Sequence, residues 1–550
     1  MAYMLQAAAG QRGAELALID ETGATTWREA NDRVNRLIRV LRAAGLGLGD
    51  RIAVFAGNSR SVFELMAAAH HAGISYVPVN WHFSAEELAY VLQDSAAKAL
   101  FTDSEFAALA GHALALAASP HASAKAAPAS IESAIPSSIR PRIEFVVCLD
   151  GQAPGMLSLD DLLAKQSDAS EPPAQAPGGP MFYTSGTTGQ PKGVLRKVPG
   201  GSPPISSLNM LAQGLVHMLQ LPTSGVTLLC GPLYHSAQWS FAFLPWLAGS
   251  CVLMSRRFDA AATLSLIDQH AVTNVHLVPT QFARLLRLDD TTKRAFSGRT
   301  LRRVWHGAAP CPPGVKRAMI DWWGPCIHEY YGSTEGAVVT GISSPEWLQR
   351  PGSVGRPIGR VAVQVLRDDL TPAPAGEAGT VYLRNLNGVV LQYHNDPTKT
   401  AAAHLASETP DPPGASGLYT TGDVGFVDAE GYLTLTDRKI DMIISGGVNI
   451  YPAEIESILA AHPAVHEVAV IGVPNEEFGE EVKALVELAP GQTGDAALAD
   501  MLTQFCREHL AGFKLPKSIE FRTNLPRTAT GKLQKRLLRE PYWAGTGRRI

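Results

Sequence analysis

A loop rich in glycine, serine and threonine and closed by a lysine is the most constraining feature of this sequence. Residues 182–193 read Phe-Tyr-Thr-Ser-Gly-Thr-Thr-Gly-Gln-Pro-Lys-Gly, and the run leading into them is apolar. Such a loop offers backbone N–H groups, hydroxyls and one ammonium to a polyphosphate, because glycines let the main chain approach an anion closely. It is not a Walker A loop, in which Ser or Thr directly follows a Gly-Lys pair. A flexible linker is the alternative, which the strand-like residues before the loop disfavour.

Length and composition bound the class of protein. A chain of 550 residues exceeds the size at which one core keeps growing, so two or more domains are expected. A formal charge of -4 argues against nucleic acid as a partner. The six cysteines are scattered without a Cys-x-x-Cys pair, which disfavours a structural zinc site and a disulfide scaffold.

Targeting segments are not apparent at the start of the chain. The first residues lack the basic region of a signal peptide, and the most apolar early stretch, residues 106–119, is shorter than the roughly 20 residues that span a bilayer. We therefore expect a cytoplasmic protein without an integral membrane segment. A peripheral membrane contact and a homodimer are left open.

Hydrophobic periodicity predicts an α/β fold. Helix-like and strand-like segments alternate along the first 280 residues, which favours parallel α/β layers. The predicted helices cover residues 27–45, 62–69 and 260–270, and the predicted strands cover 51–56, 75–79, 145–149, 226–230, 251–254 and 274–278. Residues 120–142 and 405–417 are expected to form surface loops.

The pattern of predicted elements changes after about residue 355. Short strands with glycine-rich turns, at 361–366, 379–383 and 431–435, predict an antiparallel or barrel-like part. Helices at 452–459 and 498–510 and strands at 468–473 and 482–488 then predict a small α+β domain. We expect one domain over residues 1–437 and a second over 438–550.

Four further segments give the chain a family resemblance. They are His328-Glu-Tyr-Tyr-Gly-Ser-Thr-Glu335, Tyr419-Thr-Thr-Gly-Asp423, residues 437–452 and residues 525–532. Together with the loop, and in this order, they resemble the adenylate-forming superfamily of acyl-CoA and aryl-CoA ligases, adenylation domains and luciferases, most closely an acyl-CoA synthetase. The resemblance runs from about residue 16 to about residue 536. It implies a large N-terminal domain that binds ATP and the acid, and a small mobile C-terminal lid.

The implied reaction joins a carboxylate to the α-phosphate of ATP, expels pyrophosphate and then transfers the acyl group to the thiol of CoA. Two anions must meet, so the site needs fixed cations, N–H donors and Mg²⁺. The resemblance assigns phosphate contacts to Thr184, Ser185, Gly186, Thr187, Thr188, Gly189, Lys192 and Thr334. It assigns adenine contacts to Ala308, Ala309, Pro310, Glu329 and Tyr331, ribose contacts to Asp423 and Arg438, and Mg²⁺ to Glu335 and Thr184. Tyr330, Gly332 and Ser333 are further expected nucleotide-binding residues.

Catalysis and the thiol step are also assigned by resemblance. Lys532 would stabilise charge in the adenylation step, with a surface lysine as the alternative. Thr184, Glu335 and His235 complete the expected catalytic set. Rotation of the small domain would then bring Gly446 and Gly447 to the site as a channel for pantetheine, while Phe513 and Lys517, with Lys514, would hold the CoA nucleotide.

Three positions depart from the family pattern. Ile440 stands at the hinge, where Asp or Lys is usual, so the balance between the two arrangements of the small domain is expected to differ. Val448 stands where many relatives have Glu, and Leu515 where some have a basic residue. None of these changes removes a catalytic group.

The acid pocket is expected to be apolar. Its candidates are His235, Trp239, Trp305, His306 and Gly332, and core packing is an equal alternative for Trp239. No Arg or Lys stands where it could bind a second carboxylate, so we expect a hydrophobic, fatty or aromatic acid rather than a dicarboxylate. Two alternatives remain: transfer to a carrier-protein thiol, and a non-catalytic nucleotide-binding relative, which the intact set of expected catalytic residues disfavours.

Overall fold

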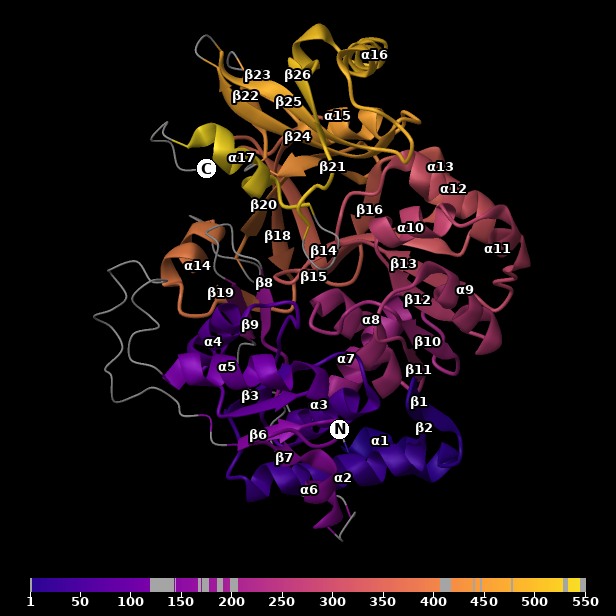
Figure 1. Ribbon diagram of the computed structural model, residues 1–550, viewed down its shortest axis with the longest axis vertical. Helices are drawn as coiled ribbons and strands as arrows, with labels where there is room; N and C mark the ends of the chain where they lie inside the picture. The colour runs from indigo at the N-terminus through magenta and orange to yellow at the C-terminus, as the bar shows by residue number, and fades with distance from the viewer. Residues whose placement is uncertain are drawn as a thin grey trace. The chain divides into compact units, whose positions relative to one another are not determined.

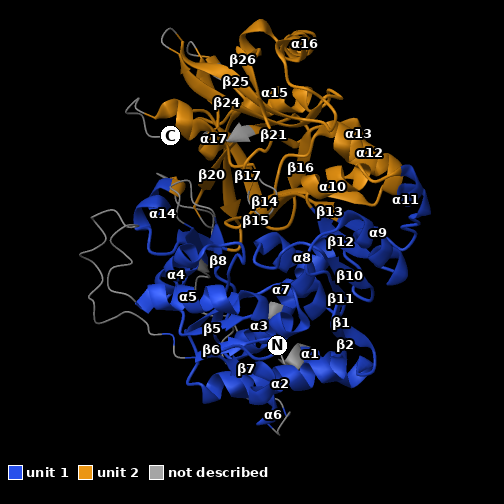
Figure 2. Cartoon of the chain, in the orientation of Figure 1, with its two compact units in different colours: residues 1–277, 290–304, 388–402 blue, residues 278–289, 305–387, 403–550 orange. Residues whose placement is uncertain are grey.

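The computed structural model describes residues 2–118, 143, 145–166, 170, 178–184, 191–197, 206–405, 417–438, 441–445, 448–475, 478–527 and 533–544. The chain forms two compact units (Figure 2). The first holds residues 1–277, 290–304 and 388–402, and the second holds residues 278–289, 305–387 and 403–550. The second unit therefore contains the end of the chain together with residues from the middle. The expected boundary at 437/438 stays a prediction.

The first unit contains a parallel sheet in the order β4-β3-β5-β6-β7, of which β3, β6 and β7 are labelled in Figure 1. Successive side chains of a strand face opposite sides of a sheet. Ile52 and Val54 of β3 accordingly join one core cluster with α2 and α3, while Ala53 and Phe55 join another with α4 and α5. The bounds are β3 Arg51–Phe55, β4 Ser75–Pro78, β5 Ala99–Thr102, β6 Phe145–Cys148, β7 Leu157–Ser158, α2 Trp27–Ala43, α3 Arg60–His71, α4 Ala85–Asp94, α5 Ala107–Ala118 and α6 Leu159–Ala164.

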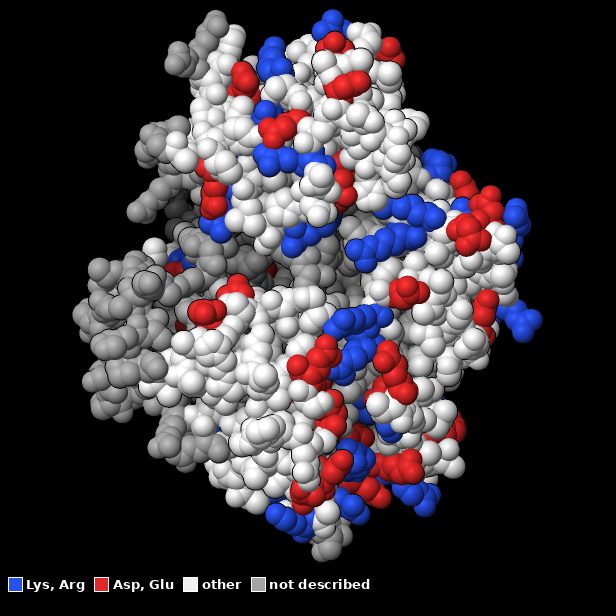
Figure 3. Space-filling model, in the orientation of Figure 1, with Lys and Arg blue, Asp and Glu red and all other residues white. Residues whose placement is uncertain are grey.

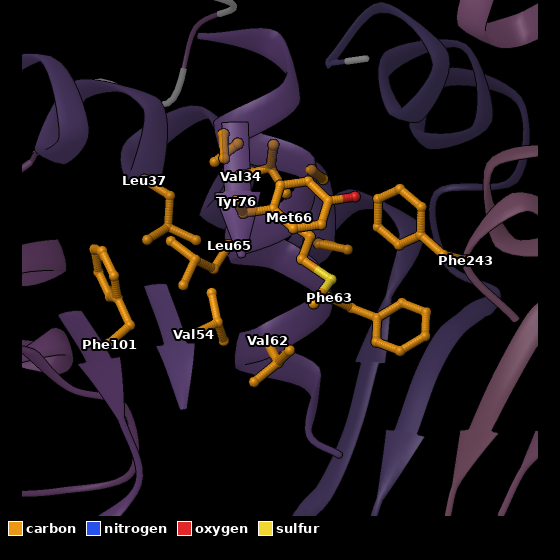
Figure 4. Packing of buried hydrophobic residues seen from close by; sticks show 14 of the residues in the cluster. Val34, Leu37, Val54, Val62, Phe63, Leu65, Met66, Tyr76, Phe101 and Phe243 are labelled. Carbon is orange, nitrogen blue, oxygen red and sulfur yellow. The ribbon is translucent and has the colours of Figure 1, made fainter. Parts of the chain in front are cut away.

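Helix α2 shows why the local sequence folds as it does. Thr26 accepts a hydrogen bond from the backbone of Glu29, whose carboxylate accepts one from the backbone of Thr26, so a capping box begins the helix. Its apolar face packs against the sheet, where Leu37, Val54 and Leu65 point toward one another (Figure 4). The capped helix α2 thus packs on one face of this sheet.

A second parallel sheet of the first unit runs β12-β10-β11-β1, with β2 added antiparallel at its edge. A small antiparallel sheet, β19-β9-β8, carries the glycine-rich loop. The bounds are β1 Leu16–Asp20, β2 Gly23–Thr26, β8 Phe182–Thr184, β9 Lys192–Lys197, β10 Val226–Leu229, β11 Cys251–Met254, β12 Asn274–Leu277 and β19 Val390–Tyr393. The helices are α1 Ala2–Arg12, α7 Ser206–Met218, α8 Ser236–Leu247, α9 Ala260–Gln269, α11 Asp290–Ala295 and α14 Pro397–Ala403.

The second unit contains an antiparallel sheet, as the short glycine-punctuated strands predicted. Its order is β17-β18-β20-β21-β16-β15-β14. The bounds are β14 Ile327–Ser333, β15 Ala337–Ser343, β16 Ser353–Pro357, β17 Val361–Leu366, β18 Gly379–Asn385, β20 Tyr419–Val427 and β21 Leu433–Arg438, with α10 Pro279–Leu286, α12 Pro313–Trp323 and α13 Ser344–Gln349. Strand β13, Arg303–His306, ends in this unit.

The last part of the chain forms the predicted small α+β body. Its sheet runs β23-β22-β25-β24, and β26 pairs with β25 in parallel. Val468 and Val470 of β24 share a core with α15 and α16, while Ala469 and Ile471 face Leu538 of α17. The bounds are β22 Ile443–Ser445, β23 Val448–Ile450, β24 Val465–Asn475, β25 Gly479–Leu488, β26 Ser518–Arg522, α15 Pro452–Leu459, α16 Ala496–Arg507 and α17 Lys535–Trp543.

Surface and covalent features agree with the composition. On the face shown in Figure 3, acidic and basic side chains are interspersed over the first unit rather than separated by sign. All six cysteines are free, and four of them are buried. Within the described ranges, no helix is both long enough and apolar enough to cross a bilayer.

Candidate active site

Strands β8 and β9 form the two arms of the hairpin that carries the glycine-rich loop. Thr184 and Lys192 stand opposite each other in the ladder, so they mark the two ends of the loop. The Lys192 ammonium lies 2.5 Å from Oδ2 of Asp396, while Oδ1 of Asp396 accepts a hydrogen bond from the backbone of Lys399 at the start of α14. The lysine expected to bind phosphate is therefore held by a carboxylate of the same unit. Asp396 is not among the residues predicted from the sequence, although an Asp before a Pro is typical of a helix start.

A second set of contacts anchors the same hairpin. The Tyr183 hydroxyl donates to Oδ2 of Asp94 at 2.6 Å, and Asn395 donates to Oδ1 of Asp94 at 3.1 Å. The ring of His394 contacts the Asp94 carbonyl through Nε2 at 3.0 Å. Burial raises the pKa of Tyr183, and the carboxylate of Asp94 raises it further, so the phenol stays a donor. The end of α4 thus fixes both β8 and the segment after β19.

Several predicted residues lie outside the described part of the chain. These are Ser185, Gly186, Thr187, Thr188 and Gly189 of the loop, Ile440 at the hinge, Gly446 and Gly447, and Lys532. The side chain of Arg438 is likewise not described. Their assigned roles stay predictions.

In the second unit, the predicted ribose and adenine residues come together. Asp423 of β20 is buried, and its Oδ2 accepts hydrogen bonds from the hydroxyl of Tyr331 at 2.6 Å and of Thr421 at 2.7 Å. In the antiparallel ladder Asp423 stands opposite Arg438 of β21. This hydrogen bond therefore joins Tyr331 and Asp423, which are 92 positions apart in the chain.

The loop after β13 lies against the strand that carries Tyr331. A Cβ added to Gly307 would lie 2.6 Å from a ring carbon of Tyr330 and 2.7 Å from its carbonyl oxygen, so only glycine permits this approach. The next residue, Ala308, has a φ of 68° and is exposed, as is Pro310, while Ala309 is half-buried. Small, accessible residues thus stand beside Tyr330, as a slot for a flat ring requires.

Glu329, the predicted partner of the adenine amino group, is already paired. Its Oε2 lies 2.5 Å from the ammonium of Lys316 on α12 and 3.7 Å from Nε2 of His306. Lys316 has no exposed surface, and its ammonium also lies 4.7 Å from the centre of the Trp347 ring. Lys316 is not among the residues predicted from the sequence, because nothing in the local pattern of α12 shows that this lysine points inward.

The turn between β14 and β15 presents the predicted phosphate and metal ligands. Ser333 accepts a hydrogen bond from the backbone of Gly336 at 2.9 Å, which fixes a tight turn around Thr334 and Glu335. Both side chains are half-buried. In the described residues no three His, Cys, Asp or Glu side chains are grouped so as to hold a metal. One carboxylate completed by phosphates and water is a typical magnesium environment, and Glu335 at this turn fits it.

The predicted pocket residues of the first unit lie around the start of α8. His235 precedes the helix as its N-cap residue, and its Nε2 is buried without a hydrogen-bond partner among the described residues. Burial lowers the pKa of His235 to about 3, with further contributions from His276 and His82, so the ring is neutral at pH 7. Such a ring can donate a hydrogen bond to a carboxylate but brings no charge to a phosphate.

Trp239 has the contacts of a core residue. It is buried, its indole N–H donates to the Tyr76 hydroxyl at 2.8 Å, and its ring stacks on Phe243 with centroids 5.3 Å apart. These contacts favour the core-packing alternative. In the second unit, Trp305 packs against His328 and Tyr330, and His306 has no exposed surface, so contact with an acid requires movement around His306. Gly332 is tightly placed, since a Cβ there would lie 2.1 Å from the Ala337 carbonyl oxygen.

The predicted CoA residue Phe513 lies in the short helical turn Gly512–Lys514 of the small α+β body, Lys517 follows this turn, and both side chains are exposed. Lys514 forms an ion pair with Glu454, and both carboxylate oxygens lie 2.7 Å from its ammonium. Phe513 and Lys517 are therefore better placed than Lys514 to reach a nucleotide.

Comparison with known proteins gives the family. Residues 5–394 match the family described as AMP-binding enzyme, and residues 454–532 match the AMP-binding enzyme C-terminal domain. The chain is 33% identical over 522 residues to a feruloyl-CoA synthase of Amycolatopsis sp., covering 94% of both chains. It is 30% identical over 540 residues to a fatty acid–acyl-carrier-protein ligase of Streptomyces coeruleorubidus, covering 97% of this chain and 95% of that one. The crystal structure of an anthranilate CoA ligase in complex with anthranoyl-AMP superposes with a TM-score of 0.82 at 26% identity, covering 98% of this chain and 96% of that one.

Proposed function

Because the chain belongs to the AMP-binding enzyme family, we propose that it activates a hydrophobic carboxylic acid as an acyl-AMP and transfers the acyl group to CoA. The enzyme is an AMP-forming acid–CoA ligase. The observation that carries the nucleotide part of the proposal is the hydrogen bond between Tyr331 and Asp423 beside the Gly307 loop. This bond joins two separate sequence segments, and the close approach of Gly307 to Tyr330 adds a third, which together suit an adenosine.

The reaction has two steps. A carboxylate oxygen of the acid attacks the α-phosphorus of ATP, the bond to the β-phosphate breaks, and pyrophosphate leaves. The thiol sulfur of CoA then attacks the acyl carbon, the thiol proton is lost and AMP leaves. Mg²⁺ held by Glu335 and Thr184 would screen the charge of the triphosphate. Lys192 would bind the terminal phosphates, and Lys532 would stabilise the charge at the α-phosphate.

The acid is proposed to be fatty or aromatic. The predicted pocket residues are apolar, aromatic or, in His235, neutral at pH 7. A neutral imidazole can donate one hydrogen bond to the reacting carboxylate without favouring a second anion. The feruloyl and anthranilate ligases among the similar proteins act on aromatic acids, which supports an aromatic ring as the first choice.

A screen of acids tests the substrate class. Pyrophosphate release is measured with ATP, CoA and acids that vary in chain length and ring content. We expect turnover with monocarboxylic acids bearing a ring or an alkyl chain and none with malonate. Preference for a short dicarboxylate would contradict the proposed pocket.

Transfer to a carrier-protein thiol is the second candidate, and it is favoured by the similarity to a fatty acid–acyl-carrier-protein ligase. The two acceptors are separated by supplying the activated acid with free CoA or with a carrier protein bearing its phosphopantetheine arm. We expect thioester on free CoA. Product only on the carrier protein would replace CoA as the acceptor.

A further inference from the structure

The buried pair Lys316–Glu329 stands beside the nucleotide residues of the second unit. Glu329 directly precedes Tyr330 and Tyr331 on β14, and His306, which contacts it, directly precedes the Gly307 loop. Lys316 approaches from α12, packed over Trp347. A charged pair without exposed ammonium surface is costly to build, because both ions lose their hydration. Its position next to the predicted adenine slot suggests a role besides stability.

The two oxygens of Glu329 differ in their surroundings. Oε2 accepts a hydrogen bond from the Lys316 ammonium at 2.5 Å. Oε1 has no hydrogen-bond partner among the described residues, and the side chain keeps 9% of its surface exposed. One oxygen is therefore held in place, and the other is free to accept a hydrogen bond from a ligand.

The charge of Glu329 depends on Lys316. Burial raises the pKa of Glu329 and lowers the pKa of Lys316, so each group alone would tend to its neutral form. The other titratable groups close to Glu329 are His306 and Cys311, so Lys316 is the ammonium or guanidinium group paired with it among the described residues. Without Lys316, a protonated Glu329 would offer a hydroxyl donor where a carboxylate offers an acceptor.

We propose that Lys316 is a positioning residue that holds Glu329 as a hydrogen-bond acceptor and thereby sets the preference of the site for a 6-amino purine over a 6-oxo purine. The inference rests on the proposed adenosine site. Adenine carries a donor at position 6, which a carboxylate accepts. Hypoxanthine carries an acceptor there, which a carboxylate repels and a protonated carboxyl can bind.

Equilibrium binding of AMP and IMP tests the proposal without knowledge of the acid. Calorimetry on the full chain should show AMP binding at least about tenfold more tightly than IMP, a difference typical of one good hydrogen bond. In Lys316→Met we expect the AMP/IMP ratio to fall by about tenfold, through weaker AMP binding and stronger IMP binding. Lys316→Gln, which keeps a donor to Glu329 without the charge, supplies the same comparison if the methionine variant does not fold.

Arg317→Met is the matched control. Arg317 is the next residue of α12 and lies 6.0 Å from the same Trp347 ring, but its side chain is exposed and is not paired with Glu329. Its AMP/IMP ratio should equal that of the unaltered protein. The proposal would be overturned if a folded Lys316 variant kept an unchanged AMP/IMP ratio, even with weaker binding of both nucleotides. Lys316 would then have a structural role alone. If the proposed function is wrong, no acid will cause pyrophosphate release, while the AMP/IMP ratio will still change in the Lys316 variants.

Discussion

Lys192 is the residue for which the structure most sharpens the sequence-based prediction. Its ammonium is shared with Asp396 at 2.5 Å, and an ammonium has further donors for a phosphate. We predict that Lys192→Met raises the KM for ATP by roughly tenfold or more, because a charged hydrogen bond contributes about 1.5–3 kcal/mol. Initial rates of pyrophosphate release at varied ATP concentration measure the effect.

Asp396→Asn is the control for that prediction. The amide oxygen of Asn can still accept the hydrogen bond from the Lys399 backbone that begins α14, so the helix start is retained. Removing the carboxylate leaves Lys192 fully available, so the KM for ATP should stay constant or fall. A rise equal to that of Lys192→Met would mean that the pair serves the fold rather than the nucleotide.

Asp423 carries the second prediction at this scale. A carboxylate can accept from both ribose hydroxyls, and Tyr331 and Thr421 already orient its Oδ2. Asp423→Ala should raise the KM for ATP and abolish the preference for ATP over 2′,3′-dideoxy-ATP. Thr421→Val, which removes one hydrogen bond but keeps the carboxylate, should retain that preference. Retention of the preference in Asp423→Ala would remove Asp423 from the ribose site.

Contiguous motifs gave hypotheses for single residues, whereas residues whose partner comes from elsewhere in the chain were not predicted. Tyr331 and Asp423 each stand in a recognisable string, and the structure joins them. Asp396 and Lys192 are 204 positions apart, and Lys316 and Glu329 are 13 apart on different elements. Such pairs depend on how a helix or strand end is oriented by tertiary packing, which no local pattern contains.

At the scale of elements, amphipathic periodicity was sufficient to predict a helix or strand that buries one face. Residues 27–45 were predicted as a helix and α2 covers Trp27–Ala43, and the strand predicted at 51–56 is β3. Helix α8 was missed because its residues are apolar on nearly every side, so its sequence has no polar face to give the period. The strand expected at 431–435 begins two residues later, as β21. Element ends are set by caps and neighbours more than by pattern.

The contact between α2 and α3 gives a prediction about stability. Arg33 of α2 donates to Oε2 of Glu64 at 2.8 Å, and the Glu64 side chain has no exposed surface. Arg33→Met would leave a buried carboxylate without its partner, which costs about 3–5 kcal/mol. We expect a lower unfolding midpoint in urea at pH 8. The double variant Arg33→Met/Glu64→Leu, which removes both charges, should recover most of the loss.

The pH dependence of that variant follows from the sign of the shift. Burial raises the pKa of Glu64, and Arg33 opposes the rise. Without Arg33 the folded state therefore binds the Glu64 proton more tightly than the unfolded state does, so stability is lost as pH rises through the folded-state pKa. The deficit of Arg33→Met relative to the unaltered protein should be small near pH 4.5 and large at pH 8. A deficit that is constant over this range would contradict the role of the carboxylate charge.

At the scale of the whole molecule, the sequence predicted the fold class and the order of its parts. Alternating segments became the two parallel sheets of the first unit, and the short strands predicted after residue 355 lie in the antiparallel sheet of the second, which already begins with β14 at residue 327. The sequence could not show that residues 278–289 and 388–402 belong to units other than those of their flanking residues. Chain connectivity does not determine which unit a crossing segment packs with, because that depends on long-range contacts.

The last prediction concerns the two half-reactions of the whole enzyme. If Lys532 supplies an ammonium only where charge develops at the α-phosphate, its loss affects only the first step. Lys532→Ala should then largely abolish acyl-AMP formation from acid and ATP while sparing the conversion of supplied acyl-AMP by CoA. Gly447→Val, which places a branched side chain in the proposed pantetheine channel, should show the opposite pattern. Pyrophosphate release and thioester formation, measured separately, distinguish the two variants. Equal loss of both steps in either variant would mean that one fixed arrangement of the chain serves both reactions, and the proposed exchange of Lys532 for the Gly447 segment would then be wrong.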